Sequence, residues 1–180
     1  MYYFKHIFFL LFLTIPFSIT NAQIREFTHP EIISFEHSTD PVTAGKNSKV
    51  SLSNKHYKHL GHSLQWNWNK PNAQIFINQP IGYLSQNPNP KETSLSTFIF
   101  WIYNPKAISS GKLKFEFLKQ GKVCSWFEYG MNFTGWSGAW LIFNRDMQGT
   151  PEEGMDELRI TAPNTDCGEI FLDHIILSSF

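Results

Sequence analysis

Apolar and polar residues alternate over many short segments of this chain, and no long window has the spacing of an amphipathic helix. The segment 62–68 places Leu64, Trp66 and Trp68 on one side and polar residues on the other. A period of two is typical of a β-strand with one buried face. We therefore predict a strand there and expect both tryptophans to lie in a core.

Other runs of β-branched and aromatic residues, separated by Gly, Pro, Asn and Asp, predict further strands. They lie at 31–36, 49–53, 73–77, 97–103, 112–118, 123–129, 133–144, 157–161 and 169–177, with a Pro/Asn-rich loop at 80–90. The run 97–103 is apolar on both faces, which indicates a central strand covered on each side, with Trp101 in the core. Gln120-Gly121 predicts a hairpin turn. About ten strands with short turns predict an all-β jelly-roll sandwich.

Residues 1–22 have the pattern of a signal peptide. Lys5 precedes an apolar run at 7–17, and a Thr-Asn-Ala stretch ending at Ala22 offers a cleavage site. The run is too short to cross a bilayer comfortably, and no lipobox cysteine follows it. We expect export to the periplasm or the exterior, no membrane span after cleavage, and one mature domain at 23–180.

Charge and cysteine content narrow the classes of partner. Fifteen basic and fifteen acidic residues leave no basic excess for neutralising phosphates, so we expect no nucleic-acid partner. The two cysteines, Cys124 and Cys167, can pair in an oxidising compartment, but their spacing does not fix their geometry and a bond stays open.

Several stretches, taken together, are similar to one known family. They are SLQWNW (63–68), FWIYN (100–104), FTGW (133–136), NRDM (144–147), MDELRI (155–160) and GEIFLD (168–173). They cover most of the mature chain and resemble the N-terminal domain of chondroitin sulfate ABC lyases, which are large secreted polysaccharide lyases.

The resemblance implies a galactose-binding-domain-like jelly roll placed before an α/α-toroid catalytic domain. In that family the His, Tyr, Arg and Glu residues of the elimination reaction belong to the toroid, and no position of this sequence matches them. We therefore assign no catalytic residue and expect the chain alone not to be an enzyme. A truncated or split lyase reading frame and a stand-alone module both stay open.

The resemblance also implies a structural cation near the first and last strands. Glu36 ends the first strand, and Asp173 interrupts the apolar last strand, where an unpaired buried charge is costly. Ser34, His62 and Gln65 close the site by resemblance, mainly through backbone oxygens. Ca²⁺, Mg²⁺ and Na⁺ all suit such oxygen ligands, and no organic cofactor is expected. Alternatively, Asp173 faces solvent or pairs with Lys or Arg.

Two other polar clusters favour no site. The series His56, His59 and His62 lies in a charged, loop-like segment without a nearby acidic or cysteine ligand, so a solvated turn is favoured over zinc. The acidic residues within 152–157 are adjacent in a loop, which does not set the carboxylate separation needed for glycoside hydrolysis.

Exposed tryptophans beside basic residues are candidates for carbohydrate binding. Trp126 lies on the more polar face of its strand, and Trp136 and Trp140 share one face of theirs. Lys112 and Lys114 form a basic strand face that can meet sulfates or carboxylates. Core packing of the tryptophans and an ordinary solvated lysine face are the competing interpretations.

We expect a non-catalytic accessory module of a chondroitin or dermatan sulfate lyase, which binds or positions glycosaminoglycan chains or packs on a catalytic domain. A purely structural interaction domain without sugar binding is the first alternative. The second is a fragment of a chondroitin sulfate ABC lyase that carries the lyase name by homology.

Overall fold

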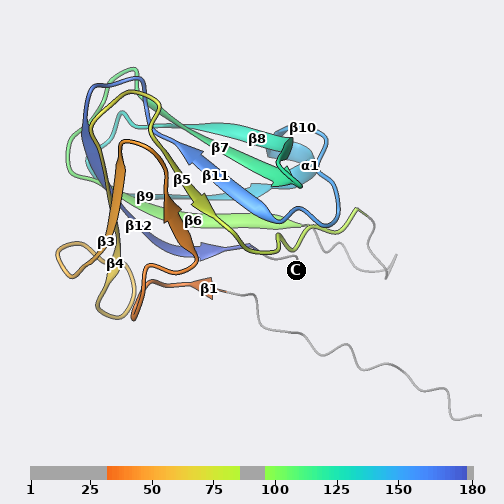
Figure 1. Cartoon of the computed structure of the whole chain (residues 1–180), viewed down its shortest axis with the longest axis horizontal. Coiled ribbons are helices and arrows are strands. Elements are labelled where there is room, and N and C mark those ends of the chain that lie inside the picture. Colours follow the sequence, from red (N-terminus) through yellow and green to blue (C-terminus); the bar gives the residue numbers. More distant parts are fainter. Residues whose placement is uncertain (1–31, 86–95, 178–180) are drawn as a thin grey trace, which may run out of the picture.

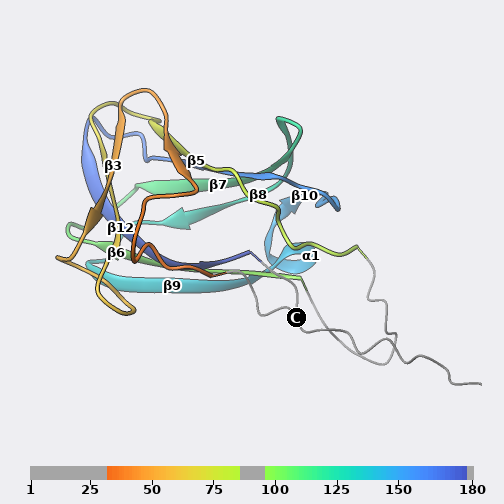
Figure 2. The ribbon, with the colours of Figure 1, turned by 60° about the horizontal axis from the view of Figure 1, so that its bottom comes forward.

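The computed structural model describes residues 32–85 and 96–177, which form two antiparallel β-sheets packed face to face (Figures 1 and 2). The predicted signal peptide lies outside these residues, as does part of the predicted 80–90 loop. The described residues contain one helix, the single α-helical turn α1 (Phe143–Asp146). No helix in this part of the chain is long and apolar enough to cross a bilayer.

Each sheet has six strands. Sheet A contains, in spatial order, β3 (Ser48–Ser53), β4 (Ser63–Trp68), β12 (Gly168–Ile176), β6 (Thr97–Asn104) and β9 (Gly135–Ile142), with β1 (Ile32–Ile33) paired to β12. Sheet B contains β10 (Gln148–Gly149), β8 (Lys122–Gly130), β7 (Lys112–Lys119), β11 (Glu157–Thr161), β5 (Gln74–Ile77) and β2 (Val42–Ala44). Distant strands become neighbours in both sheets, and the all-β jelly-roll prediction is confirmed.

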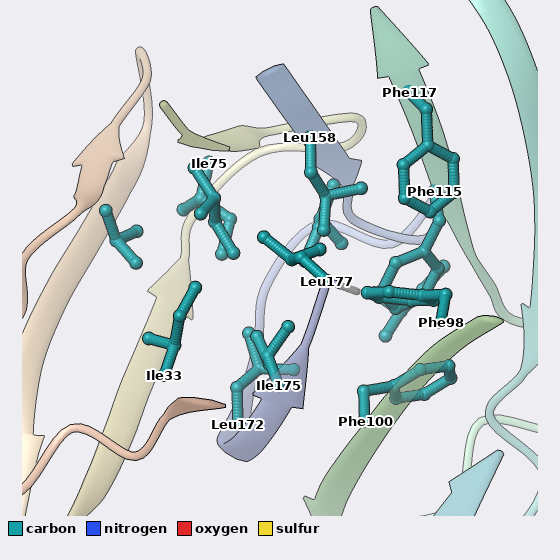
Figure 3. Close-up of a cluster of buried hydrophobic side chains, with 14 of the residues drawn as sticks. Ile33, Ile75, Phe98, Phe100, Phe115, Phe117, Leu158, Leu172, Ile175 and Leu177 are labelled. Carbon is teal, nitrogen blue, oxygen red and sulfur yellow. The ribbon is translucent and has the colours of Figure 1, made fainter. Parts of the chain in front are cut away.

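The core lies between the sheets and is dominated by phenylalanine rings (Figure 3). Phe100 of β6 stacks on Phe115 of β7 with ring centroids 4.8 Å apart, and Phe115 stacks on Phe127 of β8 at 4.6 Å. Trp66 is fully buried and Trp68 is 3% exposed, so the core positions predicted for these tryptophans are confirmed. The inward residues of each strand alternate with outward ones, as the pleat of a strand requires.

The predicted hairpin is formed by β7 and β8. Gln120 and Gly121 both have positive φ, 51° and 78°, which matches the twist that a two-residue hairpin turn needs. Lys112 and Lys114 lie on the outer face of the hairpin. Lys114 is the cross-strand neighbour of Glu128.

Three local predictions were wrong. The strand expected at 97–103 is central, but Trp101 lies on its half-buried outer face, not in the core. The strand expected at 133–144 stops at Ile142, because α1 begins there and Asp146 accepts a hydrogen bond from the Ile142 N–H at 2.8 Å. The first strand is only the two residues of β1.

Cys124 is buried and Cys167 exposed, and both are free thiols.

Candidate functional site

The predicted carbohydrate-binding residues lie on two opposite faces of the sandwich. Lys112, Lys114 and Trp126 point outward from sheet B, whereas Trp136 and Trp140 point outward from sheet A. Packed sheets are separated by about 10 Å of core, so the two sets cannot form one continuous site. The sequence favoured an outward position for Trp126 and a shared face for Trp136 and Trp140, but it indicated neither that this shared face is the outer one nor which sheet each strand joins.

The outer face of sheet B carries a compact ionic cluster. Glu116 of β7 is 6% exposed, although its side chain leaves the sheet on the outer side. Its Oε1 lies 2.7 Å from Lys114 Nζ, and its Oε2 accepts a hydrogen bond from Arg159 Nε at 2.9 Å. The cluster contains two cations, Lys114 and Arg159, and one carboxylate, Glu116. The single negative charge neutralises one of the two positive charges, so the cluster has a formal charge of about +1. We call these three residues the Glu116 cluster.

The ionisation of Glu116 is fixed by this environment. Burial alone would raise its pKa, but hydrogen bonds from Lys114 and Arg159, with the charges of both, outweigh burial and hold the pKa below its usual value. The carboxylate therefore stays ionised at neutral pH and keeps both cations in place on the strand face.

Trp126 lies beside the Glu116 cluster. It is the cross-strand neighbour of Glu116, and Lys114 Nζ lies 5.0 Å from the centroid of its ring. This cation–π contact gives the face an aromatic surface next to a positive charge. Lys112 adds no net positive charge to this face, because its ammonium lies 2.6 Å from Glu128 Oε2 and the two charges neutralise each other.

Arg159 was missed by the sequence analysis. Its position between the inward Leu158 and Ile160 indicated an outward side chain. Its neighbours could not be read from the sequence, because β11 pairs with β7 across more than 30 intervening residues (Glu157 opposite Leu118). The pairing of these two strands brings Arg159 opposite Glu116.

The outer face of sheet A is aromatic. Trp140 is 66% exposed on β9, and Trp136 of the same strand meets Tyr103 edge to face at 5.5 Å. Trp101 lies next to Gly138, and Lys58 Nζ lies 4.1 Å from the centroid of a Trp101 ring. Lys58 comes from the loop between β3 and β4, and sequence spacing offered no signal for this contact.

The two carboxylates of the predicted cation site are brought together. Asp173 is fully buried, and its Oδ2 accepts hydrogen bonds from the backbone N–H groups of Lys58 at 2.6 Å and His59 at 3.0 Å. Glu36 Oε2 accepts one from the Gly61 N–H at 3.0 Å. The alternative that Asp173 faces solvent or pairs with Lys or Arg is therefore wrong.

The free oxygens of this carboxylate pair suit a hard cation. Glu36 Oε1 and Asp173 Oδ1 are buried and receive no hydrogen bond from the described residues. Burial raises the pKa of Asp173, hydrogen bonds from backbone amides oppose this, and the charge of Glu36 raises it further. Two unsatisfied carboxylate oxygens are what Ca²⁺-type ions coordinate. The described residues contain no group of three acidic, His or Cys side chains for a metal, so further ligands there would be backbone carbonyls, hydroxyl or amide oxygens, or water.

The three other predicted ligands are placed unequally. His62 Nδ1 lies 3.7 Å from Glu36 Oε2, and Ser34 lines a hollow of about 230 Å³ together with Glu36. Gln65 instead directs its side-chain amide to Glu169 Oε2 at 2.5 Å, so its side chain is engaged elsewhere. Among the five predicted ligands, Glu36 and Asp173 are therefore the two whose side chains have a buried oxygen without a hydrogen bond from the described residues.

The histidine series and the acidic residues make local contacts in the described residues. His56 stacks on Tyr103 at 3.8 Å, while His59 packs against His174. Glu152 lies 3.4 Å from Lys119 Nζ. These three side chains therefore each have a structural partner.

The two-sheet jelly-roll fold is shared with solved structures of low sequence identity. The family 11 carbohydrate-binding module of a cellulosomal cellulase from Clostridium thermocellum superposes with a TM-score of 0.57 at 15% identity, over 84% of this chain and 95% of that one. An arabinose-bound α-L-arabinofuranosidase matches with a TM-score of 0.58 at 13% identity, over 83% of this chain and 26% of the enzyme. At these identities the likeness shows the fold.

The sequence relatives identify the family. A Bacteroides thetaiotaomicron chondroitin sulfate ABC exolyase is 42% identical over 160 residues, which are 88% of this chain and 15% of the relative. A Proteus vulgaris chondroitin sulfate ABC exolyase is 40% identical over 137 residues, or 76% of this chain and 13% of the relative. Residues 29–180 match the family model described as "Lyase, N terminal", and the chain belongs to that family. It spans about a seventh of the length of these relatives.

Proposed function

We propose that this domain is a non-catalytic accessory module that binds chondroitin- or dermatan-type glycosaminoglycan chains for a polysaccharide lyase. The observation that carries the proposal is the Glu116 cluster beside Trp126 on the outer face of sheet B. The kinship with chondroitin sulfate ABC lyases supports the choice of ligand.

The chemistry of the face suits a sulfated, uronate-containing sugar. A guanidinium group binds carboxylate or sulfate oxygens through paired donors, and an ammonium group adds a point charge. Arg159 and Lys114 offer both, while the Trp126 ring offers an apolar surface for the C–H face of a pyranose ring. Because Glu116 already orders both cations, little side-chain entropy is lost when a sugar anion binds.

Packing on a catalytic domain is the second candidate role. The favouring observation is that the relatives are about seven times as long as the matched segment, so in them this domain is joined to further chain. We propose export as the setting for either role, because residues 1–22 have the sequence pattern of a signal peptide.

A calorimetric titration of the domain with a chondroitin sulfate oligosaccharide tests the proposal. We expect saturable binding that weakens as salt rises, because charge–charge attraction near a surface is screened. A neutral dextran oligosaccharide of equal length serves as the control ligand and should give no heat. If the domain shows the circular dichroism spectrum of a folded β-protein but no saturable binding at low salt, the result would contradict the proposal.

The domain alone is expected to release no unsaturated disaccharide from chondroitin sulfate. The reaction requires a base for proton abstraction and an acid for protonation of the leaving group, and no position of this sequence matches the residues that supply them in the lyase family. Ultraviolet absorbance of the unsaturated uronate measures this directly. Product formation that persists after the protein is repurified, and disappears when the protein is heat-denatured, would contradict the non-catalytic role.

We further propose that Glu36 and Asp173 hold a structural cation, with the cation neutralising the two free oxygens. In the cation-free chain the raised pKa of Asp173 makes the folded state bind a proton more tightly than the unfolded state. The free energy of unfolding therefore falls as pH rises through that pKa and recovers in acid. At neutral pH, Ca²⁺ should raise Tm over a chelated sample by about 3 °C or more.

Thermal melts with Ca²⁺ or chelator across a pH series measure this effect. Asp173→Asn should abolish the Ca²⁺ dependence at neutral pH, whereas Asp166→Asn at an exposed position should preserve it. Identical melts with Ca²⁺ and chelator in the unmutated domain would exclude a structural cation at these carboxylates.

A further inference from the structure

We propose that the outer face of sheet A carries a second, independent subsite for an anionic sugar unit, built from Trp140, Trp101 and Lys58. The inference rests on the proposed function for its ligand class, but its residues, strands and face are different. The two subsites lie on opposite sides of the sandwich, so one domain can hold two glycan segments.

Trp140 is the first element of this subsite. It is 66% exposed on β9, and its cross-strand neighbour in β6 is Ile99, which is half-buried. Large aromatic side chains are rarely left so exposed, because burying one contributes about 1.5–3 kcal/mol. The ring can therefore gain burial from a ligand without any rearrangement of the strand.

Trp101 and Lys58 form the second element. Trp101 lies opposite Gly138, two positions from Trp140, and so is a diagonal cross-strand neighbour at about 7–8 Å. A Cβ at Gly138 would lie only 2.8 Å from the Trp101 ring, so glycine lets the indole lie close to the neighbouring strand. Lys58 Nζ lies 4.1 Å from the ring centroid and makes no ion pair with the described residues.

The position of Lys58 is fixed through its backbone. Its N–H donates to the buried Asp173 carboxylate at 2.6 Å, and the same loop is held by the Gly61 N–H bond to Glu36 and by the Ser63 hydroxyl bond to the His56 carbonyl. Asp173 Oδ2 is thus satisfied by two backbone amides, and the ammonium of Lys58 takes no part in holding this carboxylate. A preorganised cation binds an anion at lower entropic cost.

The ligand class follows from these groups. Two indole rings on a flat strand face offer stacking surfaces for pyranose C–H groups, and a cation–π-held ammonium beside them suits a carboxylate or sulfate. A neutral sugar would leave the ammonium unused, and a purely apolar protein surface would bury it unpaired at a cost. An acidic, sulfated or uronate-containing sugar fits best.

Calorimetric stoichiometry separates this inference from the proposed function. The unmutated domain should bind two chondroitin sulfate tetrasaccharides. Trp140→Ala and Lys58→Gln should each weaken one of the two binding events about tenfold or more and leave the other within about twofold. Lys55→Gln, an exposed lysine of the same loop, is the matched control and should change neither event.

The outcomes distinguish the two ideas. One binding event that Trp140→Ala and Lys58→Gln leave unchanged overturns the second subsite and keeps the sheet B site. One event that both variants weaken keeps the sheet A subsite and overturns the sheet B site. Concentration-dependent self-association that Trp140→Ala abolishes, without any effect on sugar binding, assigns this face to a protein contact and also overturns the inference.

Discussion

Binding of a chondroitin sulfate oligosaccharide to the outer face of sheet B is expected to weaken about a hundredfold or more when Lys114→Gln and Trp126→Ala are combined. The pair supplies the ammonium and the aromatic surface that meet at 5.0 Å. Glu116 keeps Arg159 as its partner in this variant, so the strand face stays folded. Calorimetry in a chain that already carries Trp140→Ala measures the loss at this face alone.

Lys122→Gln is the control for that double variant. Lys122 is an exposed lysine of the same hairpin, and its ammonium forms no ion pair with the described residues. Its replacement should change affinity by about twofold or less, in keeping with a surface charge away from the contact. Equal affinities of the double variant and the control would show that sugars do not use this face.

Phe115→Ala is expected to have the largest effect on stability, lowering the free energy of unfolding by about 3–5 kcal/mol. Phe115 is fully buried at the centre of the sandwich and stacks on Phe127 at 4.6 Å and on Phe100 at 4.8 Å. Removing its ring deletes the stacking contact between Phe115 of the β7–β8 hairpin and Phe100 of β6 (Figure 3). Urea unfolding followed by tryptophan fluorescence measures the change.

Phe76→Ala is the matched control, because Phe76 points to the outer face of β5 and is half-buried. We expect a loss of about 1 kcal/mol or less there, as for most substitutions outside a core. If Phe115→Ala costs no more than Phe76→Ala, the two sheets do not meet at this aromatic layer.

The strands and their inward faces could be predicted from the sequence, because alternation reports the pleat directly. Leu64, Trp66 and Trp68 are inward, and the hairpin turn at Gln120 and Gly121 has the expected positive φ values. The resemblance to the lyase N-terminal domain, which the family match confirms, also indicated the sheet architecture.

Long-range pairing could not be predicted, and the candidate sites depend on it. Lys58 and Asp173 are 115 positions apart, yet the Lys58 N–H donates a hydrogen bond to the Asp173 carboxylate. Arg159 reaches Glu116 only because β11 lies between β7 and β5. Alternation likewise placed Trp136 and Trp140 on one shared face, but it could not decide between core and outer face, nor place them on the sheet opposite Trp126. An individual strand pattern contains no information about its neighbours.

The indole N–H signals of the six tryptophans, followed by NMR during titration with a chondroitin sulfate tetrasaccharide, test the central claim most directly. We expect the signal of Trp126 to shift to saturation, while those of the buried Trp66 and Trp68 stay in place. An unchanged Trp126 signal under conditions where calorimetry detects saturable binding would contradict a glycan site on the outer face of sheet B.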